Sequence, residues 1–214
     1  MALYEELQES IIAGQKDKVK EEVNTLLDSD TAPIEIISEG LIGSMSIVGQ
    51  KMKSGEMFIP EVLASAHAMN EGMGMLKPLI TGDESSSLFA SKALMGTVQG
   101  DLHNIGKKIV SMILESGGFT VKDIGEDVPP DKFIEAVEQE KPDILGLSGL
   151  LTTTIPHMKG VVEALKRSNL RDKVRVMVGG APVSQDFADS IGADAYAPNA
   201  VSAVDKARQL MGQS

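Results

Sequence analysis

The sequence of 214 residues contains no cysteine and no tryptophan, and only 3% of its residues are aromatic. The lack of cysteine excludes disulfides, thiolate catalysis and cysteine-ligated zinc or iron–sulfur sites. The scarcity of aromatic rings disfavours platforms on which nucleic acid bases stack. Basic residues are also few, 20 against 31 acidic ones, and the net charge of −11 disfavours binding to a phosphate backbone. We therefore expect no nucleic acid partner.

Long apolar runs are missing as well. No run approaches the roughly 18 residues that span a bilayer, and the first six residues do not resemble a signal peptide. We expect a cytoplasmic protein with no membrane partner. The hydrophobic share of 42% and the charged share of 24% are ordinary for a globular protein.

The first eighty residues show helical periodicity alone. Apolar residues recur at steps of three and four, which place them on one face of a helix. Four successive segments carry such stripes: Leu3, Leu7 and Ile11; Val19, Val23 and Leu27; Ile34, Ile37, Leu41, Met45, Val48 and Met52; Val62, Ala66, Met69, Met73 and Leu76. The pattern predicts a four-helix bundle as an N-terminal domain over residues 1–91. The polar, serine-rich segment 81–87 is typical of a linker.

After this segment the period changes. Short apolar runs occur at residues 93–98, 119–124, 144–147, 174–178 and 193–197. Helix-like segments begin near Asn104, Pro130, Thr154, Val183 and Asn199. Five alternations of strand and helix predict a parallel sheet with helices on both faces. We expect a flavodoxin-like, doubly wound α/β domain over residues 92–214, a Rossmann-like arrangement with five strands.

The most informative segment, residues 96–108, lies between the first expected strand and the first expected helix of this domain. It contains Asp101-x-His103-x-x-Gly106. An imidazole that binds a metal through one nitrogen usually has its other N–H fixed by a carboxylate or a carbonyl. Asp101 and His103 are close enough to form such a pair. The same residues would also serve as a helix cap and a helix-start residue, and the tripeptide alone does not decide between the two.

Other loops of the same domain point to the same edge of the sheet. In a doubly wound fold the ligand binds at the carboxyl ends of the strands, where the strand order reverses between the first and third strands. The third strand leads into the hydroxyl-rich turn from Ser148 to Thr154, and the fourth ends at Gly179-Gly180. Each loop alone is typical of a turn or a cap. Together they predict a binding site. The spacing does not match a P-loop, and G-x-G-x-x-G is absent from the sequence.

Asp101-x-His103-x-x-Gly106, followed by Ser148-Gly-Leu150 and Gly179-Gly180 and preceded by a helical segment, resembles the cobalamin-binding module of corrinoid proteins. The similarity is to the methyltransferase cognate corrinoid proteins of the methylamine type, which share this module with cobalamin-dependent methionine synthase. It covers nearly the whole chain.

The resemblance implies a role for each motif. His103 would be the lower axial ligand of cobalt in place of the cofactor's own base (base-off, His-on). Asp101 would fix its tautomer, and Thr154 would extend this relay. The rest of the loop that contacts cobalamin would be Gly100, Leu102, Asn104 and Ile105. The displaced base would occupy a slot formed by Gly106, Ser148, Thr152, Gly179 and Gly180, with Ala200 as a further contact of the tail. Leu150 would be another contact of the cofactor. Met52 and Ile59 would form an apolar cap over the methyl-bearing face.

The function that the resemblance implies is methyl carriage, with cobalt cycling between Co(I) and methyl-Co(III). A substrate:corrinoid methyltransferase would load the methyl group, and a second methyltransferase would pass it to a thiol or to a tetrahydropterin or tetrahydrofolate. A reductive activator would restore Co(I). The chain would be a subunit of this system and not a stand-alone enzyme. The alternatives are a cobalamin-dependent sensor, a mutase small subunit and a flavodoxin-like receiver domain.

Overall fold

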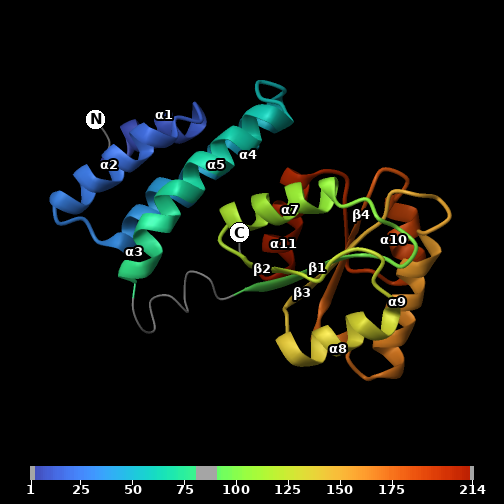
Figure 1. Ribbon diagram of the computed structural model, residues 1–214. Coiled ribbons are helices and arrows are strands. Elements are labelled where there is room, and N and C mark those ends of the chain that lie inside the picture. Colours follow the sequence, from blue (N-terminus) through green and yellow to red (C-terminus); the bar gives the residue numbers. More distant parts are fainter. Residues whose placement is uncertain (1–2, 81–90, 213–214) are drawn as a thin grey trace. The chain divides into compact units, whose positions relative to one another are not determined.

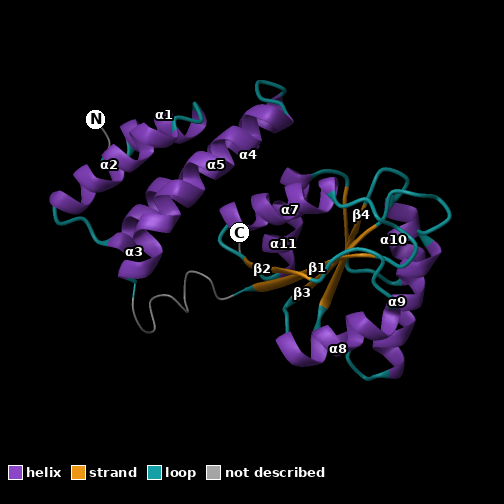
Figure 2. Ribbon diagram, in the orientation of Figure 1, coloured by secondary structure: helices purple, strands orange, loops and turns teal. Residues whose placement is uncertain are grey.

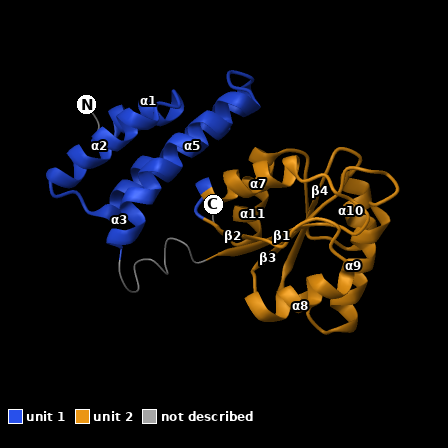
Figure 3. Cartoon of the chain, in the orientation of Figure 1, with its two compact units in different colours: residues 1–90, 116–118 blue, residues 91–115, 119–214 orange. Residues whose placement is uncertain are grey.

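The computed structural model describes residues 3–80 and 91–212 (Figure 1). The chain divides into two compact units, residues 1–90 with 116–118 and residues 91–115 with 119–214 (Figure 3). The segment expected to be a linker, residues 81–87, lies outside the described residues.

The described part of residues 3–80 is helical. Its elements are α1 (Glu5–Ile12), α2 (Lys16–Asp28), α3 (Pro33–Glu35), the π-helix η1 (Ile36–Ile42), α4 (Gly43–Ser54), α5 (Ile59–Leu76) and the 3₁₀-helix η2 (Lys77–Leu79). The third expected helix is one helical run in which η1 joins α3 to α4. Most side chains of the predicted stripes fill the interior, and Leu7, Val19, Val23, Leu41 and Met69 are at most 1% exposed. Leu3 is an exception: it precedes α1 and is 61% exposed, so its assignment to the first stripe was wrong. The N-terminal helical domain is therefore confirmed.

The second unit contains a parallel five-stranded sheet (Figure 2). The strands are β1 (Lys92–Thr97), β2 (Thr120–Asp123), β3 (Ile144–Ser148), β4 (Arg175–Gly179) and β5 (Ala195–Ala197), in the order β2-β1-β3-β4-β5. The helices between and after them are α7 (Ile105–Ser116), α8 (Pro130–Glu140), α9 (Pro156–Arg167), α10 (Gln185–Ile191) and α11 (Ala200–Leu210), with the 3₁₀-helix η3 (Arg171–Lys173) before β4. This is the flavodoxin-like strand order, so the predicted fold class is confirmed.

Alternation along the strands gives the sheet two apolar faces. Leu94, Leu145 and Val176 belong to one buried cluster, together with side chains of α8, α9 and α10. Ala93, Met95 and Met177 belong to the other, together with side chains of α7 and α11. Helices therefore cover both faces, as a wholly parallel sheet requires.

The strand order reverses between β1 and β3. Their paired residues run from Ala93 with Ile144 to Thr97 with Ser148, so both strands end at the same level. The loop after β1 and the loop after β3 consequently lie together at the carboxyl edge of the sheet. No helix in the described ranges, 3–80 and 91–212, is long and apolar enough to cross a membrane.

Candidate functional site

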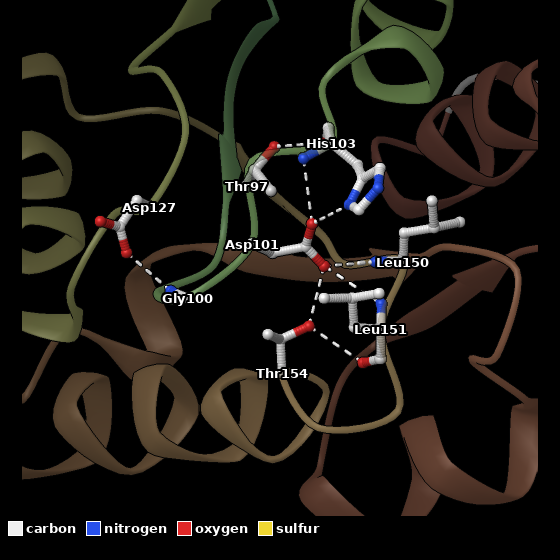
Figure 4. Close-up of polar contacts among 8 residues, drawn as sticks. All are labelled: Thr97, Gly100, Asp101, His103, Asp127, Leu150, Leu151 and Thr154. Atoms are coloured by element: carbon white, nitrogen blue, oxygen red, sulfur yellow. Dashed lines mark hydrogen bonds and ion pairs between the residues drawn. The ribbon is translucent and has the colours of Figure 1, made fainter.

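Asp101 and His103 form a hydrogen-bonded pair in the loop between β1 and α7 (Figure 4). The Nδ1 atom of His103 lies 2.7 Å from Oδ1 of Asp101, and the same oxygen accepts a hydrogen bond of 3.0 Å from the His103 backbone N–H. Gly100, at φ +83°, gives the backbone its sharp turn before the pair. The helix-cap alternative does not describe these contacts, since α7 begins only at Ile105.

The other carboxylate oxygen of Asp101 is held by the loop after β3. Oδ2 accepts hydrogen bonds from the backbone N–H groups of Leu150 (2.7 Å) and Leu151 (3.2 Å). The hydroxyl of Thr154 donates a third, of 2.8 Å. The Asp101 side chain is fully buried. Burial raises the pKa of this carboxyl, but the hydrogen bonds from His103, Leu150 and Thr154 outweigh burial and hold the pKa well below its usual range.

An ionised Asp101 fixes the proton of His103. A carboxylate without a proton can only accept, so the imidazole donates from Nδ1, and in the neutral tautomer with this proton the lone pair is on Nε2. Figure 4 shows Nε2 pointing away from Asp101, and the His103 side chain is 52% exposed. The loop thus presents the Nε2 edge of a single imidazole to a ligand. No three His, Cys, Asp or Glu side chains gather as a metal-binding group in the part of the chain that the structure describes.

Apolar side chains of the two loops that hold the Asp101–His103 pair are exposed. Leu102 and Ile105 are 73% and 75% exposed, and Leu150 and Leu151, from the loop after β3, are 43% and 40% exposed. Exposed apolar side chains gathered at one place mark a binding surface. The surface suits a ligand with an extended apolar face.

The packing of the chain requires glycine at some positions of the predicted slot and not at others. Gly180 has φ +140°, and a Cβ there would lie 1.8 Å from the backbone oxygen of Gly149. Close packing of the loops after β3 and β4 therefore requires Gly180, a reason that the sequence prediction did not contain. A Cβ on Gly106 would meet no atom within 4 Å. The packing of the chain itself does not require glycine at that position.

The remaining predicted site residues fall into two groups. Ser148 is the last residue of β3 and is paired with Gly179 of β4; Thr152 is exposed in the loop after β3. Ala200 is buried as the first residue of α11, after the cap residue Asn199. These positions share the carboxyl edge of the sheet with the Asp101–His103 loop. Met52 and Ile59 are partly exposed in α4 and at the start of α5, in the other compact unit, so their role as a cap stays a prediction.

Comparison with known proteins decides the family. A model of the B12 binding domain matches residues 91–205, and a second model, also of a B12 binding domain, matches residues 3–77. The chain is 46% identical over 209 residues to the dimethylamine corrinoid protein of Methanosarcina barkeri, covering 98% of this chain and 97% of that relative. The chain belongs to the methyltransferase cognate corrinoid proteins. Members of this family are the corrinoid methyl carriers of methyltransferase systems.

Two solved structures resemble this corrinoid protein over nearly its whole length. A cobalamin-binding protein from Desulfitobacterium hafniense is 31% identical, with a TM-score of 0.81, covering 95% of this chain and 96% of that one. The methanol:cobalamin methyltransferase complex MtaBC from Methanosarcina barkeri contains a chain that is 30% identical, with a TM-score of 0.86. That match covers 99% of this chain and 80% of the other.

Cobalamin or a related corrinoid is the cofactor of this family, and the site fits it. A single imidazole nitrogen suits a metal that brings its own equatorial ligands in a macrocycle. The exposed leucine and isoleucine side chains suit the apolar part of such a ring. Gly106 leaves room beside the loop for a bulky ligand. His103 would hold the cobalt, and the carboxyl edge of the sheet would hold the rest of the cofactor.

Some residues of this corrinoid protein that shape the site were missed at the sequence level. Thr97, Glu126 and Asp127 form hydrogen bonds with the His103 loop. Lys107 forms one with Asp123, at the end of β2. The burial of Lys107 could have been predicted from the sequence. Lys107, Val110 and Leu114 lie at steps of three and four and therefore share one helix face. A lysine in line with buried apolar residues indicates a buried charge. The other three left no comparable pattern.

Proposed function

We propose that the chain binds cobalamin in the base-off, His-on mode through His103 and carries a methyl group between two methyltransferases. The observation that carries the proposal is the Thr154–Asp101–His103 relay, which fixes one tautomer of an exposed imidazole. When bound, the corrinoid supplies cobalt that takes up a methyl group as Co(I) and holds it as methyl-Co(III).

The relay keeps the His103 donor ready. Asp101 holds the Nδ1 proton, and Thr154 together with the backbone N–H groups of Leu150 and Leu151 holds the carboxylate in place. Such outer contacts raise the basicity of an imidazole ligand and fix its direction. The predicted slot residues Gly106, Ser148, Thr152, Gly179, Gly180 and Ala200 would accommodate the displaced nucleotide tail.

The helical domain, residues 1–91, would act as a cap for the α/β domain, residues 92–214. Met52 and Ile59 would exclude water from the reactive face, and the flexible thioether of Met52 can adapt as the cap moves aside. Support comes from the family match to residues 3–77, which identifies this segment too as a B12 binding domain.

The partners follow from the carrier role. A substrate:corrinoid methyltransferase would load the protein, and the match to the MtaBC complex supports docking to such an enzyme. A second methyltransferase would transfer the methyl group to a thiol or a tetrahydropterin, and a reductive activator would restore Co(I). Because each partner must reach the same face in turn, the contacts should be transient and modest in area. We also expect the system to work in the cytoplasm of an anaerobe.

Spectroscopy of His103 variants tests the proposal. Anaerobically purified protein should show the electron-spin spectrum of cob(II)alamin with coupling to one protein imidazole nitrogen. His103→Ala and His103→Gly should lose this coupling and retain corrinoid less tightly. His67→Ala, in α5, is the control and should keep it. Persistence of imidazole coupling in the His103 variants would overturn the assignment.

A further inference from the structure

Lys107 is a buried charge in an unfavourable place. Its side chain is 1% exposed, and it is the third residue of α7. The positive end of the helix dipole lies there and disfavours an ammonium group. Burial disfavours the charge as well unless it is paired. The Lys107 ammonium forms an ion pair with the Asp123 carboxylate and donates a hydrogen bond of 2.7 Å to the backbone oxygen of Gly125.

Stability alone is a poor reason for such a pair. Replacing a buried ion pair by apolar side chains of similar volume is often neutral or stabilising. A residue that breaks local rules in this way indicates a role in a functional site. The contacts of the Lys107 ammonium with other parts of the domain indicate what this role is.

Lys107 connects α7 to the turn that follows β2, which we call the 123–127 turn. Within this turn, the Asp123 carboxylate also accepts a hydrogen bond of 2.9 Å from the Gly125 N–H. The Gly125 oxygen also accepts a hydrogen bond of 3.0 Å from the N–H of Thr97, the last residue of β1. The ammonium therefore joins the first turn of α7, the 123–127 turn and the end of β1 at one point.

The 123–127 turn in turn holds the His103 loop. Oδ1 of Asp127 accepts a hydrogen bond of 2.6 Å from the Gly100 N–H (Figure 4), and the Asp127 N–H donates one of 3.0 Å to the Asp101 backbone oxygen. The Asn104 amide donates to the Glu126 carboxylate. The loop is thus held on both sides of His103, and none of these bonds uses the Asp101 carboxylate.

We propose that the 123–127 turn, anchored by Lys107, is a positioning element that sets the direction of the His103 imidazole. Lys107 and Asp127 are its positioning residues. The inference rests on the proposed ligation of cobalt by His103. The affinity of a metal for a ligand depends on outer contacts that orient the ligand, and a site whose support is loosened by a small displacement loses function. The relay through Thr154 fixes the tautomer, and the 123–127 turn fixes the backbone that carries the ring.

Two neighbouring lysines give a matched test. Lys107→Met removes the anchor, whereas Lys108→Met removes the same charge from an exposed position one residue further along α7. We expect Lys107→Met to bind cobalamin about 10-fold or more weakly, in the range found for outer-contact residues. The fraction of cob(II)alamin with imidazole nitrogen coupling should fall with it, and Lys108→Met should match the wild type. A folded Lys107→Met protein with unchanged affinity and full coupling would overturn the proposal.

Asp127 gives a test that does not depend on a buried charge. The residue is exposed and has a left-handed φ of 53°, which both Asn and Gly tolerate. Asp127→Asn keeps the acceptor for the Gly100 N–H, and Asp127→Gly removes it. The glycine variant should lose imidazole coupling and affinity, and the asparagine variant should retain both. Equal behaviour of the two variants refutes the positioning role, whether or not Lys107→Met folds.

A third measurement separates this inference from the proposed function. If the wild type itself shows no imidazole coupling, the ligation proposal fails. The positioning role is then decided by amide hydrogen exchange of Asp101 and His103 in the cofactor-free protein. Exchange should be faster in Asp127→Gly than in Asp127→Asn, because only the latter keeps a side-chain acceptor for the Gly100 N–H. Equal exchange rates would show that the 123–127 turn does not position the loop.

Discussion

The hydroxyl of Thr154 donates a hydrogen bond of 2.8 Å to the carboxylate oxygen of Asp101 that does not bond to His103. Thr154 is 4% exposed, so water is largely excluded from this bond. A buried hydrogen bond to a charged group contributes about 1.5–3 kcal/mol. The side chain therefore matters both for the stability of the α/β domain and for the direction of the Asp101 carboxylate.

Two substitutions of Thr154 distinguish the effect of its hydroxyl from the effect of its methyl group. Thr154→Ala should lower the free energy of unfolding by about 1–3 kcal/mol and weaken cobalamin binding by about 10-fold. Thr154→Ser keeps the hydroxyl and should stay close to the wild type in both. Denaturant unfolding and cobalamin titration check the prediction. It fails if Ser and Ala at this position behave alike.

The partly buried carboxyl of Glu22 should give the helical domain a pH-dependent stability. Oε1 accepts a hydrogen bond of 2.8 Å from the Ser10 hydroxyl, and Oε2 has no hydrogen-bond partner among the described residues. Burial raises the pKa of this carboxyl, and the bond from Ser10 only partly opposes it. A raised pKa means that the folded state binds the proton more tightly. The stabilisation is present below the unfolded pKa and is lost as pH rises through the folded value.

Glu22→Gln removes this titration. The stability of the variant relative to the wild type should increase as the pH rises above about 4, because the wild-type carboxyl then ionises in the folded state as well. Urea unfolding at several pH values measures it. Glu21→Gln, at the exposed neighbouring position, is the control and should change little over the same range. A flat difference for Glu22→Gln would show that the Glu22 carboxyl is as well solvated in the folded as in the unfolded state.

The α/β domain alone should retain the cofactor but protect it less. Residues 92–214 contain the sheet and every predicted contact except Met52 and Ile59, so we expect this fragment to unfold cooperatively and to bind cobalamin. Its methyl–cobalt bond should be photolysed or oxidised several times faster than in the full chain, because the proposed cap is missing. Loss of the absorbance of the methylated form under constant light checks this. Equal rates would refute the role of the helical domain as a cap.

The holo-protein alone should not demethylate a simple methyl donor at a useful rate. Transfer from nitrogen or oxygen needs an acid or a metal at the leaving atom, and positioned acid–base groups contribute about 10²–10⁴-fold. His103 and Asp101 are engaged with each other and, by the proposal, with cobalt. Turnover should appear only when a substrate methyltransferase, a reductant and an activator are added. Rapid demethylation by this chain with reduced corrinoid and no second protein would overturn the carrier assignment.

Much of the fold was predictable because the spacing of apolar residues along the sequence indicates which side chains are buried in a helix or a strand. The stripes through Leu7, Val19 and Leu41 predicted helices whose side chains are buried, and the change of period after residue 91 predicted the parallel sheet. Boundaries were less predictable. The helix expected near Thr154 begins at Pro156, because Thr154 bonds to Asp101 from the loop. The π-helical stretch η1 also had no sequence signal, since its side chains keep the spacing of an ordinary helix.

The sequence by itself brought Asp101 and His103 within reach of each other, because residues two positions apart in a tight loop are always close. Only the tertiary structure decided what surrounds the pair. Leu150 and Thr154 are 49 and 53 residues from Asp101, and Asp127 is 27 residues from Gly100. They meet because β1 lies between β2 and β3, which brings the loops after all three strands to one edge. Strand order depends on the packing of the whole domain, and no local spacing encodes it.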